Sequence, residues 1–449
     1  MTSKMRQLIT IICALLLLSG CGTYDHYEPY GTASWSDQTS IDSLPSWRTM
    51  FSDSCLVALI DTALTHNSDL QTAQLNSEIA RETLRQAKWQ QVPALGIQAD
   101  GGNASVVGDA ISTYSITGQA SWQIDIFGQL RNARKAAAEQ LLQSQAYQQA
   151  VQTNLIAAVA TAYYSLLLAH EQQQILESTL HNWDETLQMM EVIRQGGTGV
   201  SEAELLQARA NSMAIRSAMA ANQRDLTLAN NAICLLINQP VHHIYHGNLW
   251  QQATNDSVLS NIPLAWLSMR PDVRASEHAL AQAYYITRQM HANFYPSIRL
   301  SGTAGWSNNF GGVLLDPAGF VASAVGGLVQ PIINHGINRM QYRNARSRQA
   351  IAQQQFSHTL IKAGIEVNNT IAQRQAAQQM VDIETNREAL MHQSVEKTIL
   401  LMRHSSVSYL EVLTAQQQLL QTQKAKADAQ YNKLTATVAL YQALGGGVR

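Results

Sequence analysis

The sequence predicts an α+β membrane protein built from two copies of one structural repeat. Three features support this: stretches of two-residue alternation, helical runs of roughly 70 residues, and the same order of elements recurring about 203 to 208 positions later. The chain has 449 residues, of which 46% are apolar, so it is not a disordered polymer. Its net charge of −2, with 14% charged residues, offers no basic face, and we expect no nucleic-acid partner.

The N-terminus has the pattern of an exported, lipid-anchored protein. Two basic residues precede an apolar run from Leu8 to Leu18, which is too short to span a bilayer but suits a secretory signal. The run ends in LSGC at residues 18–21, which resembles the lipobox of bacterial lipoproteins. The resemblance implies a signal peptide over residues 1–20 and N-palmitoyl and S-diacylglycerol groups on Cys21. A chance Cys after an ordinary signal is the alternative, and Gly22 is compatible with the outer membrane.

The first repeat is expected over residues 51–238, after an extended tether over residues 21–50. Its first helix runs from Asp53, a suitable N-cap, to Gln91, before Pro93. A β-hairpin over residues 92–126 follows. Its second strand alternates cleanly from Ile111 to Ile126, and a shorter partner over residues 95–100 precedes it across a loop with Gly, Asn and Ser. A long helix over residues 128–195 and a shorter one over 200–238 complete the repeat.

The second repeat is expected over residues 263–449 and has the same order of elements. The predicted elements are a helix over residues 270–293, a hairpin over 295–331 with a weakly alternating last strand, a long helix over 336–404 and a helix over 407–444. The segment over residues 239–262 has no counterpart and is interpreted as a connector at the equator of the molecule.

The strands carry one apolar and one polar face, which suits a membrane barrel. Open sheet edges leave backbone groups unpaired in lipid, so membrane strands must close into a barrel, and four strands cannot close one alone. If the strands span a membrane, several copies must therefore share one barrel. A soluble four-stranded sheet packed on helices is the alternative. Each long helix can be covered only by two shorter ones stacked end to end, which predicts a bundle about 100 Å long.

Several blocks of sequence resemble the TolC-like outer-membrane efflux family. They are residues 47–70, WQIDIFGQLR at 122–131, RPDVRASE at 270–277, FYPSIRLSG at 294–302, and 328–336. Together with the lipobox they resemble its lipoprotein branch serving RND pumps, the NodT-type outer-membrane factors. The resemblance implies a homotrimer with a twelve-stranded outer-membrane β-barrel, four strands per chain, continuous with a periplasmic α-helical barrel.

The same resemblance implies a function. The trimer would be the outer-membrane channel of a tripartite system, passively exporting drugs or other small toxic compounds. An inner-membrane RND pump and a periplasmic adaptor would be its partners. A type I secretion duct for polypeptides uses the same architecture, and a lipid-anchored periplasmic coiled-coil scaffold would explain the helices but not the strands.

Two similar stretches, VSEAELLQA at residues 200–208 and VSYLEVLTA at 407–415, follow the two long helices. The resemblance places them at the periplasmic tip. It implies a gate formed by Leu410 and Thr414 with Ala203 and Gln207, and tip charges for adaptor contact. These charges are Arg194, Glu202, Glu204, Arg403 and Glu411. Thr414 stands where the family has Asp, and Ser405 where it has Gly, so we expect closure by an apolar Leu410 ring without an acidic one. Alternatively, the Glu residues are solvated helix-start charges.

No enzyme or metal site is predicted. His242-His243 and Met189-Met190 lack carboxylate or Cys partners at ligand spacing, and no cofactor besides the lipid is expected. Cys55 and Cys234 could pair in an oxidising compartment or remain two small buried residues.

Overall fold

The computed structural model describes residues 27, 46–106, 109–196, 199–252, 264–308, 320–403 and 408–446. The predicted signal peptide, Cys21, Gly22, Ser405 and most of the tether lie outside the described residues. The chain forms two compact units. Unit 1 takes residues 1–36, 75–146 and 274–359, and unit 2 takes residues 37–74, 147–273 and 360–449. Each predicted repeat therefore contributes to both units, because strands from both repeats share one sheet and helices from both share one core.

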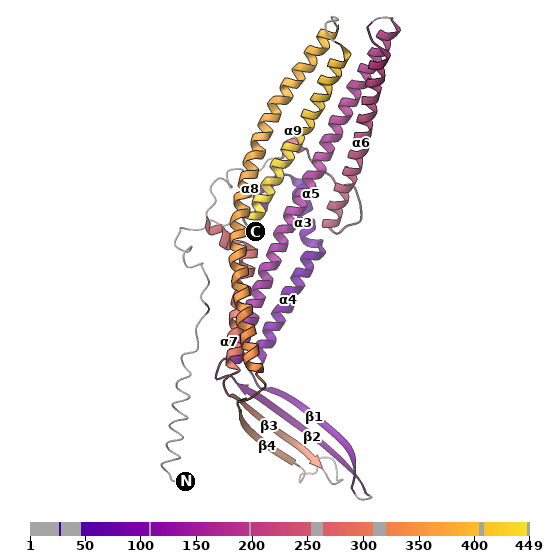
Figure 1. Cartoon of the computed structure of the whole chain (residues 1–449). Coiled ribbons are helices and arrows are strands. Elements are labelled where there is room, and N and C mark those ends of the chain that lie inside the picture. Colours follow the sequence, from indigo (N-terminus) through magenta and orange to yellow (C-terminus); the bar gives the residue numbers. More distant parts are fainter. Residues whose placement is uncertain are drawn as a thin grey trace. The chain divides into compact units, whose positions relative to one another are not determined.

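The two repeats give helices of equal length. The long helices α5, Gln129–Gln195, and α8, Ile337–Arg403, have 67 residues each (Figure 1). The helices that follow them, α6, Glu202–Leu236, and α9, Tyr409–Ala443, have 35 residues each. At 1.5 Å per residue, a helix of this greater length spans about 100 Å.

The predicted helix from Asp53 to Gln91 is wrong as one element, because the chain breaks at Asn67. It forms α3, Ser54–His66, and α4, Ser68–Trp89. Asn67 has an extended backbone, and its Oδ1 accepts hydrogen bonds from the backbone N–H groups of residues 69 and 70. Its Nδ2 donates to the carbonyl of Leu236 at the end of α6, 2.9 Å away. Asn67 therefore caps α4 and joins the α3–α4 junction to the end of α6.

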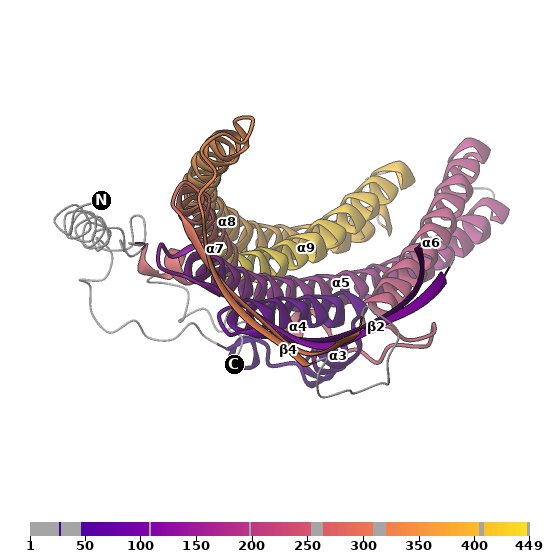
Figure 2. The same cartoon turned by 90° about the horizontal axis from the view of Figure 1, so that it is seen from below.

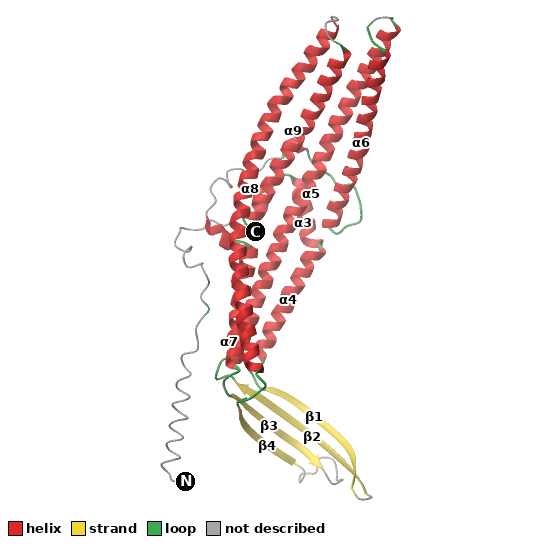
Figure 3. Cartoon of the chain, in the orientation of Figure 1, coloured by secondary structure: helices red, strands yellow, loops and turns green. Residues whose placement is uncertain are grey.

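Four antiparallel strands form one curved sheet in the order β1-β2-β3-β4 (Figures 2 and 3). They are β1, Ala94–Val106, β2, Asp109–Ile124, β3, Ser297–Asn308, and β4, Phe320–Val329. The short partner strand and loop predicted before β2 are wrong, because β1 continues through the Gly- and Asn-containing stretch to Val106. The two hairpins meet through β2 and β3, so the sheet joins the two repeats.

The register gathers most apolar residues of the four strands on one face of the sheet. One row across the sheet runs Ile97, Gly118, Ala304, Ala322, and a second begins at Ile116 and continues through paired Trp306 and Phe320. The opposite face carries Gln98, Asp100, Thr117, Gln119, Arg299, Thr303 and Ser323. Val321 and Val325 lie on this second face, which explains why β4 alternates poorly in sequence.

Helix α7, Pro271–Ala292, belongs mainly to unit 1, where it contacts part of the predicted tether. The ring centroid of Tyr27 lies 5.6 Å from that of Tyr284 and 6.5 Å from that of Tyr285. In unit 2, the end of the predicted tether is a short helix, α2, Trp47–Met50, whose Trp47 is 2% exposed. The tether is therefore not extended up to residue 50, because its last residues are part of the core.

The main core of unit 2 gathers apolar side chains from α2, α3, α5, α6, α9 and the connector. The fully buried members include Leu56, Ile60, Ile156, Tyr163, Leu167, Ile233, Leu249 and Tyr441. Among the described helices, α5 alone is long and apolar enough to cross a membrane by length and composition, but 56% of that window is buried. Its apolar character is thus explained by its position in the core.

The connector is held to this core by side-chain hydrogen bonds. The Asp53 carboxylate, which caps α3 as predicted, accepts hydrogen bonds from the Tyr163 hydroxyl and from Gln252 Nε2, each at 2.7 Å. The Tyr163 hydroxyl accepts from the Gly247 N–H at 2.8 Å. Burial would raise the pKa of Asp53, but these hydrogen bonds lower it below its usual value. Ile244 and Leu249 are also buried, so the described part of the connector is anchored to the core at a few positions.

We predict that Gly305→Ala destabilises the sheet. A Cβ at Gly305 would lie 2.1 Å from the carbonyl oxygen of Ile116 on the neighbouring strand. Overpacking of this kind costs about 1–3 kcal/mol of unfolding free energy, which denaturant titration followed by circular dichroism will measure. Gly302→Ala in the same strand is the control, because its nearest atom would lie at an ordinary 3.5 Å. Equal stability of the two variants would contradict the prediction.

Candidate functional site

The first of the two similar stretches begins α6 with a capping box. The Ser201 hydroxyl accepts a hydrogen bond from the Glu204 N–H at 3.2 Å, and Glu204 Oε2 accepts from the Ser201 N–H at 2.8 Å. Glu204 therefore caps the helix and is only partly exposed. Glu202 is exposed, and its carboxylate lies 3.7 Å from the Arg194 guanidinium at the end of α5. Such an exposed pair contributes little stability.

The second stretch begins α9 differently, although Ser408 and Glu411 have the same spacing. The Ser408 side chain makes no capping hydrogen bond. Glu411 is exposed, and the Arg403 side chain lies outside the described part of the chain. Tyr409 takes the position that Glu202 has in the first stretch and is only 6% exposed. The two helix starts have therefore diverged in both capping and packing.

All four predicted gate residues are exposed in the single chain. Leu410 is 56% exposed, and the Thr414 hydroxyl donates to the Leu410 carbonyl at 2.7 Å. Ala203 and Gln207 occupy the matching positions of α6. Because Leu410 and Thr414 are four residues apart, they share one face of α9. That face has an apolar side chain and a hydroxyl that bonds its own helix.

A shared apolar cluster fixes the two helix starts against α5. It contains Trp183 and Met190 from α5, Leu205, Ala208 and Ile215 from α6, and Tyr409, Leu413 and Leu420 from α9, together with Leu176. The cluster lies on the buried sides of α6 and α9, so the residues predicted to form the gate remain on other faces. Met190 is fully buried here while Met189 is 40% exposed, so the two do not form a ligand pair.

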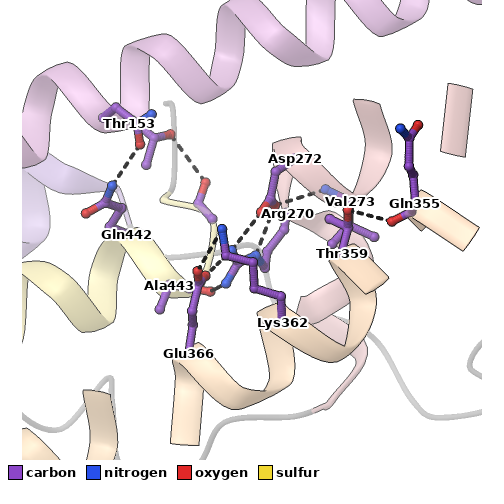
Figure 4. A network of polar contacts seen from close by, with 12 residues as sticks. Thr153, Arg270, Asp272, Val273, Gln355, Thr359, Lys362, Glu366, Gln442 and Ala443 are labelled. Atoms are coloured by element: carbon purple, nitrogen blue, oxygen red, sulfur yellow. Dashed lines mark hydrogen bonds and ion pairs between the residues drawn. The ribbon is translucent and has the colours of Figure 1, made fainter. Parts of the chain in front are cut away.

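A second polar site surrounds Arg270 in the RPDVRASE block. The sequence motif marked this block as a family resemblance but did not indicate the ion pairs of Arg270. Its guanidinium donates to the Ala443 carbonyl at 2.6 Å, to Asp272 at 2.8 and 3.0 Å and to Glu366 at 2.7 Å (Figure 4). Lys362 lies 3.6 Å from Glu366. Arg270 therefore joins the start of α7 to α8 and to the end of α9. Burial would raise the pKa of Asp272, but the Arg270 hydrogen bonds and charge lower it.

The remaining candidate ligands are accounted for by local contacts. Cys55 and Cys234 are free thiols, the first partly exposed and the second buried. Asn230 Nδ2 donates to the His242 carbonyl at 2.7 Å, and His242 Nδ1 lies 2.9 Å from the Pro240 carbonyl. Among the described residues, no group of three or more His, Cys, Asp or Glu side chains is arranged to hold a metal ion.

A known protein family matches both repeats of the chain. The family model described as outer membrane efflux protein matches residues 59–239 and 263–446. The chain belongs to this outer membrane efflux protein family. The cation efflux system protein CusC of Escherichia coli K12 is 30% identical over 456 residues, with 97% of this chain and 98% of CusC covered.

Other known proteins align over similar lengths. The solvent efflux pump outer membrane protein SrpC of Pseudomonas putida is 28% identical, with 97% of each chain covered. The probable outer membrane lipoprotein SilC of Salmonella typhimurium is 29% identical, with 89% of this chain and 88% of SilC covered. A crystal structure of CusC superposes with a TM-score of 0.84 at 27% identity, covering 94% of this chain and 99% of that one.

These findings confirm the resemblance to the outer-membrane efflux family that the sequence indicated. They also confirm the predicted fold class, which is that of trimeric outer-membrane efflux channels. The protein is an outer-membrane efflux channel with a periplasmic portion, and its family is one of transport channels. The soluble-sheet and scaffold alternatives are therefore set aside.

We predict unequal effects of removing the two matching serines. Ser201→Ala should lower the unfolding free energy by about 1 kcal/mol, since it removes the hydroxyl of the capping box. Ser408→Ala should change it by well under half of that, because Ser408 makes no capping bond. Thermal unfolding of the two variants, measured side by side, provides the comparison. A larger loss for Ser408→Ala would refute the assignment of the caps.

Proposed function

We propose that three copies of this chain form the passive outer-membrane duct of a tripartite pump. In this proposal an inner-membrane RND pump delivers small toxic compounds through a periplasmic adaptor into the duct. The observation that carries it is the two-faced sheet, together with a family match that spans both repeats. A soluble sheet would cover its apolar face with a packed core, but here Leu95 and Ile97 on that face are 82% and 84% exposed.

Backbone pairing supports three copies in one barrel. Strands β1 and β4 form the two edges of the sheet, and an edge exposed to lipid is costly because its backbone groups lack partners. We infer that β1 of each copy pairs with β4 of the next, so that three four-stranded sheets close a twelve-stranded barrel. The apolar face then contacts lipid and the polar face lines the pore.

Aromatic side chains support the same orientation of the sheet. Trp306 and Phe320 pair near one end of the apolar face, with ring centroids 5.4 Å apart. Trp122 lies near the other end of that face, and its Nε1 donates to the Gln91 carbonyl at 3.0 Å. Aromatic residues at both ends of a lipid-facing band are typical of outer-membrane barrels, where they lie at the two membrane interfaces.

We propose Leu410, Thr414, Ala203 and Gln207 as the gate of the duct. Three copies would contribute Leu410 as an apolar ring and Thr414 as a neutral one. The Thr414 hydroxyl supplies no negative charge and already bonds its own helix. Hydrophobic constrictions close pores by excluding water, so the Leu410 ring is the closing element in this proposal.

The charged residues beside the gate are proposed for adaptor contact. Glu411 is exposed, and Glu202 and Arg194 form an exposed pair. Glu204 is less suited to adaptor contact, because its carboxylate already accepts hydrogen bonds within the capping box. Arg403 ends α8 beside the second turn and belongs to this group by position.

Small compounds are the proposed substrates. Relatives named for cation efflux and for solvent efflux align over almost the whole chain. Cargo of such different chemistry points to a duct that does not itself select, with selection left to the pump. None of the three relatives named above is described as exporting polypeptides, so the type I secretion alternative gains no support from them.

We predict that Leu410→Ser raises the conductance of the purified protein in planar bilayers, on the order of twofold or more, because a hydroxyl lets water enter an apolar constriction. Leu206→Ser is the matched control: Leu206 is equally exposed, at 56%, but lies outside the proposed gate. Conductance that is unchanged by Leu410→Ser would place the constriction elsewhere. A wild-type protein that forms no pores would overturn the duct itself.

We propose N-palmitoyl and S-diacylglycerol groups on Cys21, which lies outside the described residues but within the lipobox-like stretch. Cys21→Ser should abolish incorporation of labelled palmitate into the protein, since the acylated thiol is removed. The relative named as a probable outer membrane lipoprotein supports this. Unaltered labelling of the Ser variant would refute lipidation at this residue.

A further inference from the structure

Two charged side chains of opposite sign lie well apart on the polar face of the sheet. Among the strand side chains that the structure describes, those of Asp100 in β1 and Arg299 in β3 are the charged ones. In the register, Asp100 is the partner of Ser115 in β2, and Arg299 is the partner of Gln123 in the same strand. Both charges therefore belong to the face that is proposed to line the pore.

Arg299 lies at the end of the sheet that adjoins the helices. It follows the start of β3 at Ser297, shortly after α7 ends at Ala292. Its side chain is exposed, and it lines a cavity of about 270 Å³ together with Asp125. The Asp125 carboxylate is 12% exposed and lies 3.3 Å from Nε of Arg131, which offsets its charge. The positive charge of Arg299 therefore remains available to solutes at this end of the sheet.

Asp100 keeps its negative charge among neutral partners, far from Arg299. Its Oδ2 accepts hydrogen bonds from Gln98 Nε2 at 2.9 Å and from the Ser115 hydroxyl at 3.4 Å. The register partners of the two charges, at positions 115 and 123 of β2, are about 26 Å apart along the strand at about 3.3 Å per residue. Because the Debye length is about 10 Å at 0.1 M salt, each charge acts on solutes separately.

We propose that three copies of Arg299 form a positively charged ring in the duct, which locally favours small anions over cations. This inference rests on the proposed function, in which the polar faces of three sheets line one pore. Rings of charged side chains set the charge preference of pores, and rings of Arg or Lys favour anions. Three copies of Asp100 form a second ring, farther from the helices, which favours cations.

The Arg299 ring should change the ion preference of the duct a few-fold. Three unit charges about 10 Å from an ion in water, screened over one Debye length, change the local concentration of a monovalent ion about twofold. Anions are enriched and cations depleted by this factor, so their ratio changes about fourfold. Such a bias is small beside the selection left to the pump, and the duct still passes cargo of different chemistry.

The test measures the reversal potential of the full-length protein in planar bilayers under a KCl gradient centred near about 0.1 M. Arg299→Gln should lower the ratio of chloride to potassium permeability about twofold to fourfold, because it removes the charge of the ring. Arg299→Lys keeps the charge and should keep the wild-type ratio. Asp100→Asn should shift the ratio in the opposite direction, which a general disturbance of the barrel would not do.

Pores of Arg299→Gln with the wild-type permeability ratio would overturn the charged ring and leave the duct intact. Equal shifts in Arg299→Gln and Arg299→Lys would also overturn it, since they would show that shape rather than charge matters. At about 1 M KCl the Debye length is about 3 Å, so a shift of undiminished size there would contradict an electrostatic origin. A wild-type protein that forms no pores would instead overturn the proposed function itself.

Discussion

Backbone pairing in lipid is the constraint on which the rest of this structure depends. Strands in a hydrocarbon environment must give every N–H and C=O a partner, and a four-stranded sheet with open edges at β1 and β4 does not. The membrane portion is thus incomplete in one chain. Its register holds most apolar residues of the four strands on one face, and this arrangement suits several sheets that close around an aqueous pore.

The helical portion uses the same duplicated plan with unequal details. Helices of matching length arise from both repeats, yet their starts differ. Ser201 and Glu204 form a capping box at the start of α6. At the start of α9, the Ser408 side chain makes no capping hydrogen bond, and the adjacent Tyr409 is buried. Leu206 is exposed, and its counterpart Leu413 is buried at 3% exposure. The two halves therefore provide one common scaffold and two different surfaces beside the proposed gate.

The sequence predicted most helices and strands because periodicity is a local property of the chain. It missed the break at Asn67, where the side chain caps one helix and bonds the end of another that is 169 positions away. The strand predicted for β1 was too short, because Gly and Asn usually mark loops. Pairing with β2 keeps that stretch extended. The Arg270 ion network depends on Glu366 and Ala443, which are 96 and 173 positions away in the sequence, and no local pattern encodes such contacts. Thr414 is proposed for the gate because a family motif, rather than periodicity, marks that position.

The pairing of β2 with β3 joins the two halves of the duplication through main-chain hydrogen bonds within one polypeptide. A chain with a single repeat would need six copies to build the same ring, and each junction would depend on concentration. Covalent linkage makes half of these junctions intramolecular and raises the effective concentration of their partners. It reduces assembly to the meeting of three chains. It also frees each half to evolve separately, since a substitution then appears three times around the ring instead of six.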